Sequence, residues 1–261
     1  AVCDGGVAGG VSRDAAWEWI ACFDSGVGSV RRLPWRMKAV FCPRYGSPDV
    51  LEIREVERPA PGPGELLVRV RATTVTSADC RVRAMNVPLG MGLIARLVLG
   101  LRGPRCGVLG AEFSGEVERV GMGVTAFGVG DRVIGYPGVR MGAHAESVCI
   151  AEEGLVVRAP NSLSHEEAAG IAFGGLTALY FLRDRGRVRP GHRVLVNGAS
   201  GAVGTAAVQL GVHFGAEVTG VCSAANAELV RSLGAARVID YAKEDVTPAG
   251  AGDDIIMDTV G

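Results

Sequence analysis

The chain has 261 residues, of which 48% are hydrophobic and 21% are charged, a globular composition with enough apolar material for one or two domains. The formal net charge is −1 and the pI is about 6.5, so no global basic excess argues for nucleic acid or an anionic membrane as partner. No apolar stretch reaches the roughly 20 residues that span a bilayer. We therefore predict no nucleic-acid and no membrane partner.

The cysteine pattern indicates a reducing compartment. The seven cysteines are scattered, and no two of them form a C-x-x-C pair. This pattern fits neither a zinc knuckle nor a disulfide framework. The simplest prediction is a cytoplasmic protein.

Residues 1–36 are predicted to be an extension outside the fold. They contain Gly-rich pieces and Trp17, Trp19 and Trp35, but they lack the basic and apolar regions of a secretory signal. The numbered chain begins with Ala1 rather than Met. We expect it to be a fragment or a processed product.

Short strand-like runs separated by Gly and Pro predict a β-rich domain over residues 37–160. The expected strands are 37–41, 50–56, 65–72, 111–120, 130–133 and 143–150, with turns such as Pro61-Gly62-Pro63-Gly64 between them. The apolar segment 89–101 is interrupted by Arg96. We expect it to be a helix that lies over a cleft or in the core.

After Pro160 the pattern changes to alternating helices and strands, which is typical of a parallel sheet. Ser164 precedes Glu166 and Glu167, a signature of a helix start. Four strands are expected at 193–197, 217–222, 237–240 and 254–258, in the doubly wound order 3-2-1-4. The last two strands of such a sheet are not present, so the chain is expected to stop partway through a nucleotide-binding domain that begins at residue 161.

A glycine turn between a buried strand and a helix is the most informative motif. The strand 194–196 runs into a G-x-x-G-x-x-G sequence, and a helical pattern follows. Such a turn lets the backbone approach a pyrophosphate, and the helix N-terminus offers free N–H groups to it. The residues predicted to bind a dinucleotide here are Gly198, Ala199, Ser200, Gly201, Ala202, Val203 and Gly204.

The end of the next strand favours NADP over NAD. An Asp or Glu at this point would hold the ribose hydroxyls of NAD, but the chain has Cys222-Ser223-Ala224-Ala225-Asn226. Ser223 and Asn226 are candidate donors to a 2′-phosphate. The alternative is that both residues cap the following helix, because both types are good N-caps. No Lys or Arg lies in this stretch.

The chain from about residue 37 onward resembles the medium-chain dehydrogenase/reductase superfamily, in its zinc-independent quinone-oxidoreductase-like branch. The matching segments, in chain order, are MKAVFCPRYGSPDVLEIREVERPAPGPGELLVRVRATTV, LGAEFSGEVERVG, VGDRVIG, GAHAE, EEAAGIAFGGLTAL, VLVNGASGAVGTAAVQL and LGAARVIDY. The resemblance implies an α/β protein, with a GroES-like β-rich barrel over 37–160 and a partial Rossmann doubly wound parallel sheet over 161–261. It also implies NADP-dependent reductase chemistry and a homodimer at full length.

The resemblance also places the positions where zinc-dependent relatives carry metal ligands. Those positions hold Thr76, Ala111 and Phe173 in this chain. Zinc requires N, S or O donors in near-tetrahedral geometry, which Ala and Phe do not offer. The interval from Val133 to Ala143 is too short for the structural zinc lobe with its four cysteines. We therefore predict no metal site.

Without a Lewis acid, hydride transfer is easiest to a conjugated acceptor, whose developing charge spreads onto a carbonyl oxygen that hydrogen-bond donors can stabilise. A quinone or an α,β-unsaturated carbonyl fits this requirement, so the resemblance implies a small-molecule substrate. One alternative is an enoyl-thioester reductase, and another is a non-catalytic NADPH-binding or interaction protein on the same scaffold.

Four further site residues follow from the resemblance, each with a plainer alternative. Thr76 is expected at the reacting centre, or it is merely a β-branched residue at a strand end. Asp79 handles protons or ties down the local backbone. Thr177 lies near the nicotinamide, or its hydroxyl bonds within its own helix. Tyr241 contacts the adenosine phosphate or packs on the sheet.

Overall fold

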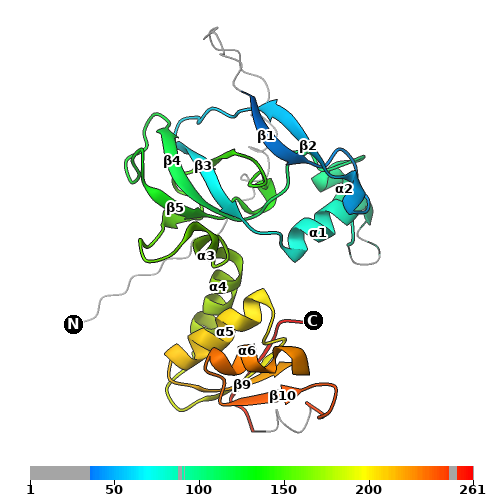
Figure 1. Ribbon diagram of the computed structural model, residues 1–261, viewed down its shortest axis with the longest axis vertical. Coiled ribbons are helices and arrows are strands. Elements are labelled where there is room, and N and C mark those ends of the chain that lie inside the picture. Colours follow the sequence, from blue (N-terminus) through cyan, green and yellow to red (C-terminus); the bar gives the residue numbers. More distant parts are fainter. Residues whose placement is uncertain (1–35, 88–89, 91, 247–251, 261) are drawn as a thin grey trace, which may run out of the picture. The chain divides into compact units, whose positions relative to one another are not determined.

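The computed structural model describes residues 36–87, 90, 92–246 and 252–260, which fall within one compact unit (Figure 1). The extension predicted for 1–36 lies outside the described residues, except that Arg36 begins strand β1 (Arg36–Phe41). The boundary predicted between 160 and 161 stays a prediction.

The first part of the chain forms two antiparallel sheets. Strand β1 pairs with β2 (Glu52–Glu57), and five further strands form a sheet in the order β6-β3-β4-β5-β7. Their bounds are β3 (Glu65–Thr73), β4 (Phe113–Val120), β5 (Arg132–Gly135), β6 (Ser147–Ala151) and β7 (Val156–Arg158). The strand predicted at 50–56 starts later, because Pro48–Val50 form a short 3-10 helix. Strand β7 was not predicted, since three residues carry no alternation to recognise.

One face of the five-stranded sheet carries its core. Leu66 and Val68 of β3 pack with Phe113 and Val117 of β4, and all four are essentially inaccessible to solvent. Residues two apart on a strand lie on the same face. Leu66 and Val68, and likewise Phe113 and Val117, therefore face the same side of the sheet and build this core.

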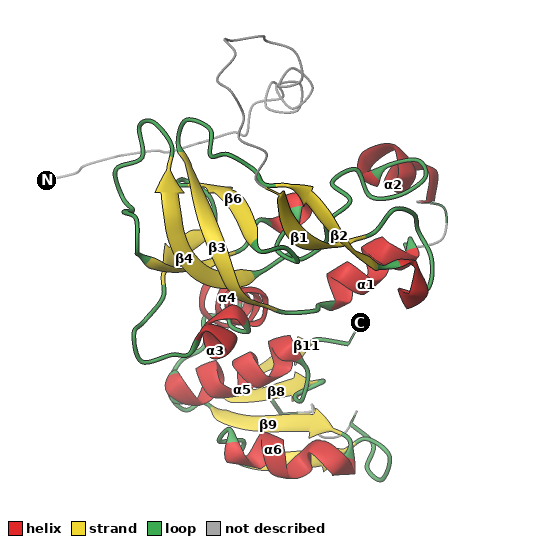
Figure 2. Ribbon diagram, turned by 45° about the horizontal axis from the view of Figure 1, so that its top comes forward, coloured by secondary structure: helices red, strands yellow, loops and turns green. Residues whose placement is uncertain are grey.

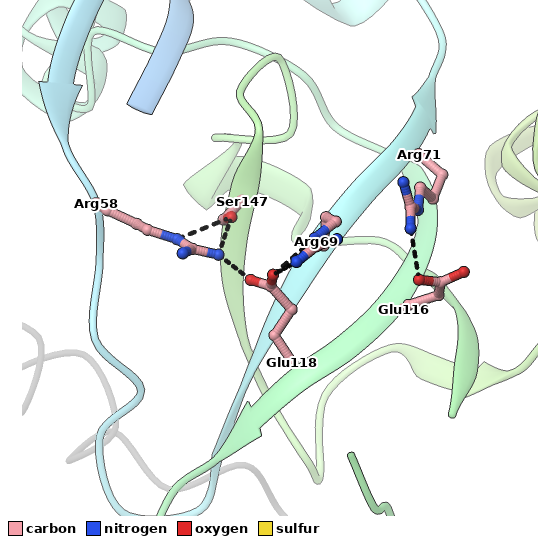
Figure 3. Close-up of polar contacts among 6 residues, drawn as sticks. All are labelled: Arg58, Arg69, Arg71, Glu116, Glu118 and Ser147. Atoms are coloured by element: carbon pink, nitrogen blue, oxygen red, sulfur yellow. Dashed lines mark hydrogen bonds and ion pairs between the residues drawn. The ribbon is translucent and has the colours of Figure 1, made fainter. Parts of the chain in front are cut away.

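A polar network ties three strands together on the sheet's other surface (Figure 3). Glu118 lies at a β-bulge, because Leu67 pairs with Arg119 while Val68 pairs with Val117. Its carboxylate accepts hydrogen bonds from Arg58 and Arg69. The Arg58 guanidinium also donates to Ser147 Oγ of β6, at 3.0 Å. The network is built from paired charges and holds β3, β4 and β6 in register.

Two helices interrupt this sheet between β3 and β4. They are α1 (Ser77–Ala84) and α2 (Gly92–Leu99). The helix expected from the apolar segment is present, but no residue of α2 is buried. Of the two predicted positions, the core is therefore wrong, and a position over a cleft stays a prediction. Among the described residues, no helix is long and apolar enough to cross a membrane.

The second part of the chain is built on a four-stranded parallel sheet (Figure 2). Its order is β10-β9-β8-β11, which confirms the predicted order 3-2-1-4. The strands are β8 (Arg193–Asn197), β9 (Glu217–Cys222), β10 (Arg237–Asp240) and β11 (Ile255–Asp258), and the helices are α3 (His165–Ala169), α4 (Ala172–Leu179), α5 (Ala202–His213) and α6 (Ala227–Ser232). A π-helix (Tyr180–Arg185) continues α4. The predicted helix start is confirmed as a capping box between Ser164 and Glu167.

The parallel sheet is buried, as its near-continuous apolar strands require. Val194 and Val196 of β8 pack with Val208 of α5 and Val218 of β9 in one core cluster. The sheet therefore holds the carboxyl ends of β8 and β9 beside the N-terminus of α5. That edge is where ligands bind in doubly wound sheets.

Candidate functional site

The glycine turn has a backbone that other residues do not readily adopt. Gly198 has φ +75°, and a Cβ placed there would lie 2.5 Å from Thr259 Oγ1. A Cβ at Gly204 would lie 2.1 Å from the carbonyl oxygen of Gly198. Both glycines are therefore required by the turn itself, which brings the start of α5 against the end of β8.

The N-terminus of α5 is open to an anion. Gly201 is the N-cap residue and provides no side-chain cap. Within the described residues, the N–H groups of Ala202, Val203 and Gly204 have no backbone acceptor. A Cβ at the exposed Gly201 would meet only the Gly198 carbonyl, at 3.4 Å, so space above the turn is available to a ligand. Uncapped first-turn N–H groups and the positive end of the helix dipole are what a phosphate requires.

Ala199 differs from the other residues of the turn. It is fully buried within the core cluster, and its N–H donates to Val221 O at 2.9 Å. The structure therefore gives Ala199 a packing role between β8 and β9. Its side chain offers nothing to a bound nucleotide.

Three of the predicted polar residues meet at the ends of β8 and β9. Asn226 Nδ2 donates to Ser200 Oγ at 3.1 Å and to Ser223 Oγ at 3.4 Å. Neither Ser223 nor Asn226 makes a side-chain cap to the helix it precedes. Because each serine oxygen accepts from the amide, both O–H hydrogens remain available to donate to a further acceptor.

Acidic and basic side chains border this cluster on the neighbouring strand. Asp240 is paired with Cys222 in the β9–β10 register, and its charge contributes to raising the pKa of the Cys222 thiol, after the larger effect of burial. Lys243 Nζ lies 3.6 Å from Asp240 Oδ2. Tyr241 is exposed at the end of β10. Sequence reasoning missed Asp240, because it considered only the strand that follows the glycine turn.

Thr76 and Asp79 form the N-terminal cap of α1. Thr76 Oγ1 donates to Asp79 Oδ2 at 2.6 Å, and the Thr76 N–H donates to the same oxygen at 2.8 Å. The other carboxylate oxygen, Oδ1, accepts from the Gly110 N–H at 2.8 Å. Asp79 is 3% exposed. Through these hydrogen bonds, Asp79 ties α1 to the segment that precedes β4.

Hydrogen bonds made by neighbouring residues link the segments that carry Thr76, Ala111 and Phe173. Asp79 bonds to Gly110, as described, and the buried Glu112 accepts from the Phe173 N–H at 2.7 Å and from the Thr74 hydroxyl. Ala111 lies between Gly110 and Glu112. The segments that carry the three positions are therefore linked, and two of the side chains at these positions, a methyl group and a phenyl ring, cannot coordinate a metal.

Tyr136 adjoins the candidate site, and the sequence reasoning missed it. It follows β5, and its ring stacks on Phe173 with centroids 6.3 Å apart. Burial, then the charges of Glu112 and Asp79, raise the pKa of its phenol. The hydroxyl has no hydrogen-bond partner among the described residues. The VGDRVIG segment immediately before it was the available signal.

Helix α4 links the two halves of the site. Phe173, at its start, is held by Glu112, and Thr177 lies one turn later. The Thr177 hydroxyl makes no hydrogen bond within the described chain. The alternative that it bonds within its own helix is therefore not supported. A Cβ at Gly174 would lie 2.4 Å from Ala202 O, so α4 touches the first turn of α5.

An apolar cavity of about 570 Å³ lies between β5, β7, α4 and α5. Tyr136 lines it, and of the residues predicted to bind the nucleotide only Ala202 does. The cavity therefore lies beside the uncapped turn and does not coincide with it.

Comparisons with known proteins agree with this architecture. Residues 62–185 match the alcohol dehydrogenase GroES-like domain family. The chain is 39% identical to a quinone oxidoreductase of Pseudomonas aeruginosa over 77% of this chain and 58% of that protein. It is 34% identical to the 2-haloacrylate reductase of a Burkholderia species, over 84% of this chain and 65% of that protein. The chain thus spans less than two thirds of the length of these curated relatives.

Among solved structures, a probable oxidoreductase from Mycobacterium abscessus superposes with a TM-score of 0.75 at 30% identity, covering 88% of this chain and 70% of that one. This chain belongs to the medium-chain dehydrogenase/reductase superfamily, in its quinone-oxidoreductase-like branch. Membership confirms the predicted combination of a GroES-like domain with a parallel nucleotide-binding sheet.

Proposed function

We propose that the protein is a zinc-independent, NADPH-dependent oxidoreductase that transfers hydride to a quinone or an α,β-unsaturated carbonyl. The observation that carries the proposal is that hydrogen bonds of Asp79 and Glu112 link the segments that carry Thr76, Ala111 and Phe173. A methyl group and a phenyl ring occupy two of the three positions at which zinc-dependent members ligate metal, so carbonyl polarisation has to come from hydrogen-bond donors.

The residues around the glycine turn fit a dinucleotide. The uncapped N–H groups of Ala202, Val203 and Gly204 would bind the pyrophosphate. When bound, the nicotinamide supplies the hydride. Thr177 and Phe173, both on α4, would position the ring. The names of the relatives, a quinone oxidoreductase and a 2-haloacrylate reductase, support conjugated acceptors as the substrate class.

Preference for NADPH is inferred from the Ser200–Ser223–Asn226 cluster. Its two free hydroxyl hydrogens can donate to a 2′-phosphate, and no carboxylate lies between residues 222 and 226. The negative charge of Asp240 opposes this preference, and the ammonium group of Lys243 partly neutralises that charge.

Tyr136 is the proposed donor to the acceptor's carbonyl oxygen. Its raised pKa keeps the phenol protonated at neutral pH, and its stacking on Phe173 fixes the ring. Thr76 and Asp79 act as positioning residues in this scheme, because the Thr76 hydroxyl hydrogen is already donated to Asp79.

The direct test is calorimetric titration with NADPH and NADH, followed by loss of the reduced-nicotinamide absorbance with quinones, enones and enoyl-thioesters. We expect tighter binding of NADPH, and turnover of quinones or enones. Ser223→Asp should reverse the cofactor preference, whereas Ser162→Asp, an exposed loop substitution of equal charge, should not. Binding of neither cofactor would refute the proposal, binding without turnover would support the non-catalytic alternative, and faster enoyl-thioester turnover would support the thioester reductase.

The resemblance also predicts a homodimer at full length. The oligomeric state is measured by light scattering after size exclusion, and a monomer at micromolar concentration would contradict that prediction.

A further inference from the structure

Helix α2 presents an apolar face to solvent. Leu93, Ile94, Leu97 and Val98 are each between 55% and 71% exposed, and Leu101 just beyond the helix is 63% exposed. At about 100° per residue, the four helical positions fall within an arc of about 140°, so they form one continuous stripe. A stripe of this width normally faces a core.

The helix is anchored from its other side, so the stripe is a fixed feature. The Tyr45 hydroxyl donates to Gly100 O at 2.8 Å, and the Arg105 N–H donates to Leu99 O at 2.8 Å. The Arg96 guanidinium lies 5.5 Å from the centre of the Tyr45 ring. These contacts hold the C-terminal end of α2 and leave its apolar face uncovered within the described chain.

The segment around this face is strongly basic. Between residues 80 and 111 the sequence contains five arginines and no Asp or Glu, although the whole chain has a net charge of −1. Arg81, Arg96, Arg102 and Arg105 are exposed. Over the described ranges, none of these four guanidinium groups lies within ion-pair distance of a carboxylate. Those of Arg96 and Arg105 donate to the carbonyl oxygens of Leu101 and Leu97, whereas no such bond holds those of Arg81 and Arg102 within the described residues.

We propose that α2 and its flanking arginines form a docking surface for a membrane that carries anionic lipid headgroups, in contrast to the absence of a membrane partner predicted from the charge of the whole chain. An interfacial helix buries an apolar stripe at the acyl boundary while arginines reach the headgroups, and this surface presents both features. A second copy of the chain is a poorer occupant, because two such faces would bring like-charged arginines together. The helix has eight residues, so binding is peripheral and reversible.

The test is co-sedimentation of the whole chain with vesicles of phosphatidylcholine alone and of phosphatidylcholine with phosphatidylserine. We expect binding to the anionic vesicles that weakens as salt increases. Leu97→Glu with Val98→Glu should lower partitioning at least about tenfold. The matched control, Met122→Glu with Val139→Glu, changes the charge equally at residues 80% and 81% exposed, and should leave partitioning unchanged. Arg102→Gln should lower it about fivefold.

Three outcomes would overturn the proposal. One is equal binding of the α2 double variant and its control, and another is absence of binding to anionic vesicles at low salt. The third is concentration-dependent dimerisation that only the α2 double variant abolishes, which would assign the face to a second copy. Circular dichroism checks that both double variants are folded. If the α2 variant were not, the Arg102 variant and the salt dependence would decide.

Discussion

Replacing Asp79 by alanine separates a scaffold role from a catalytic one. The substitution removes the acceptor for the Gly110 N–H and the Thr76 N–H, both at 2.8 Å, from a site where Asp79 is 3% exposed. Each donor left unsatisfied costs about 1–3 kcal/mol when buried. The Thr76 hydroxyl is partly exposed and can turn to water. We therefore expect a loss of about 3–4 kcal/mol in the free energy of unfolding, a large share of a typical total of roughly 5–15 kcal/mol.

The assay is urea unfolding followed by circular dichroism. Asp79→Asn keeps one acceptor oxygen and should cost about half as much. Thr76→Ser preserves the capping box and should stay within about 0.5 kcal/mol of the wild type. An unchanged midpoint for Asp79→Ala would refute the scaffold argument. A loss of activity without a loss of stability would instead indicate that Asp79 takes part in proton transfer.

Three further predictions follow from the site and its surroundings. Tyr136→Phe keeps the stack on Phe173 but removes the hydrogen-bond donor, so kcat should fall about 100-fold with little change in KM. Because the phenol pKa is raised, the kcat of the wild type should decline with rising pH only above about pH 10. An unchanged kcat in the variant would exclude Tyr136 as the donor. Gly204→Val should abolish NADPH binding by calorimetry and lower stability by about 3 kcal/mol, whereas Gly128→Ala, with no atom within 4 Å of the added Cβ, should be neutral. Burial raises the pKa of Cys149 to about 12, with a smaller contribution from the Glu65 carboxylate. At about pH 8, iodoacetamide should therefore modify the exposed Cys80 well before Cys149, and mass spectrometry of the digested protein measures both reactions.

Local patterns predicted those features that local physics determines. The glycine turn and the Ser164 capping box each depend on residues within one supersecondary unit. The strand order of the parallel sheet was predicted from the usual order of doubly wound sheets. The convergence of Gly110, Glu112 and Phe173 depends on hydrogen bonds across tens of residues. No periodicity reports such pairs, and it was the family resemblance that singled out Ala111 and Phe173.

Two errors have clear physical causes. Apolar content predicted that the segment 89–101 lies over a cleft or in the core. No residue of α2 is buried, because apolar content alone does not determine whether another element covers the helix. The cofactor preference was predicted from the residues at the end of β9 alone, whereas Asp240 lies at the same edge on the adjacent strand. Parallel sheets bring together the ends of strands that are far apart in sequence, so cofactor preference depends on the edge as a whole.

The close approach of Gly174 to Ala202 has a consequence for building chimeras of this family. Any larger side chain at residue 174 would push the first turn of α5, since its Cβ would lie 2.4 Å from a backbone oxygen. Helix α4 and the start of α5 are therefore best inherited from one parent as a single cassette. A crossover placed between them would join two surfaces that never fitted each other, even when each half folds well.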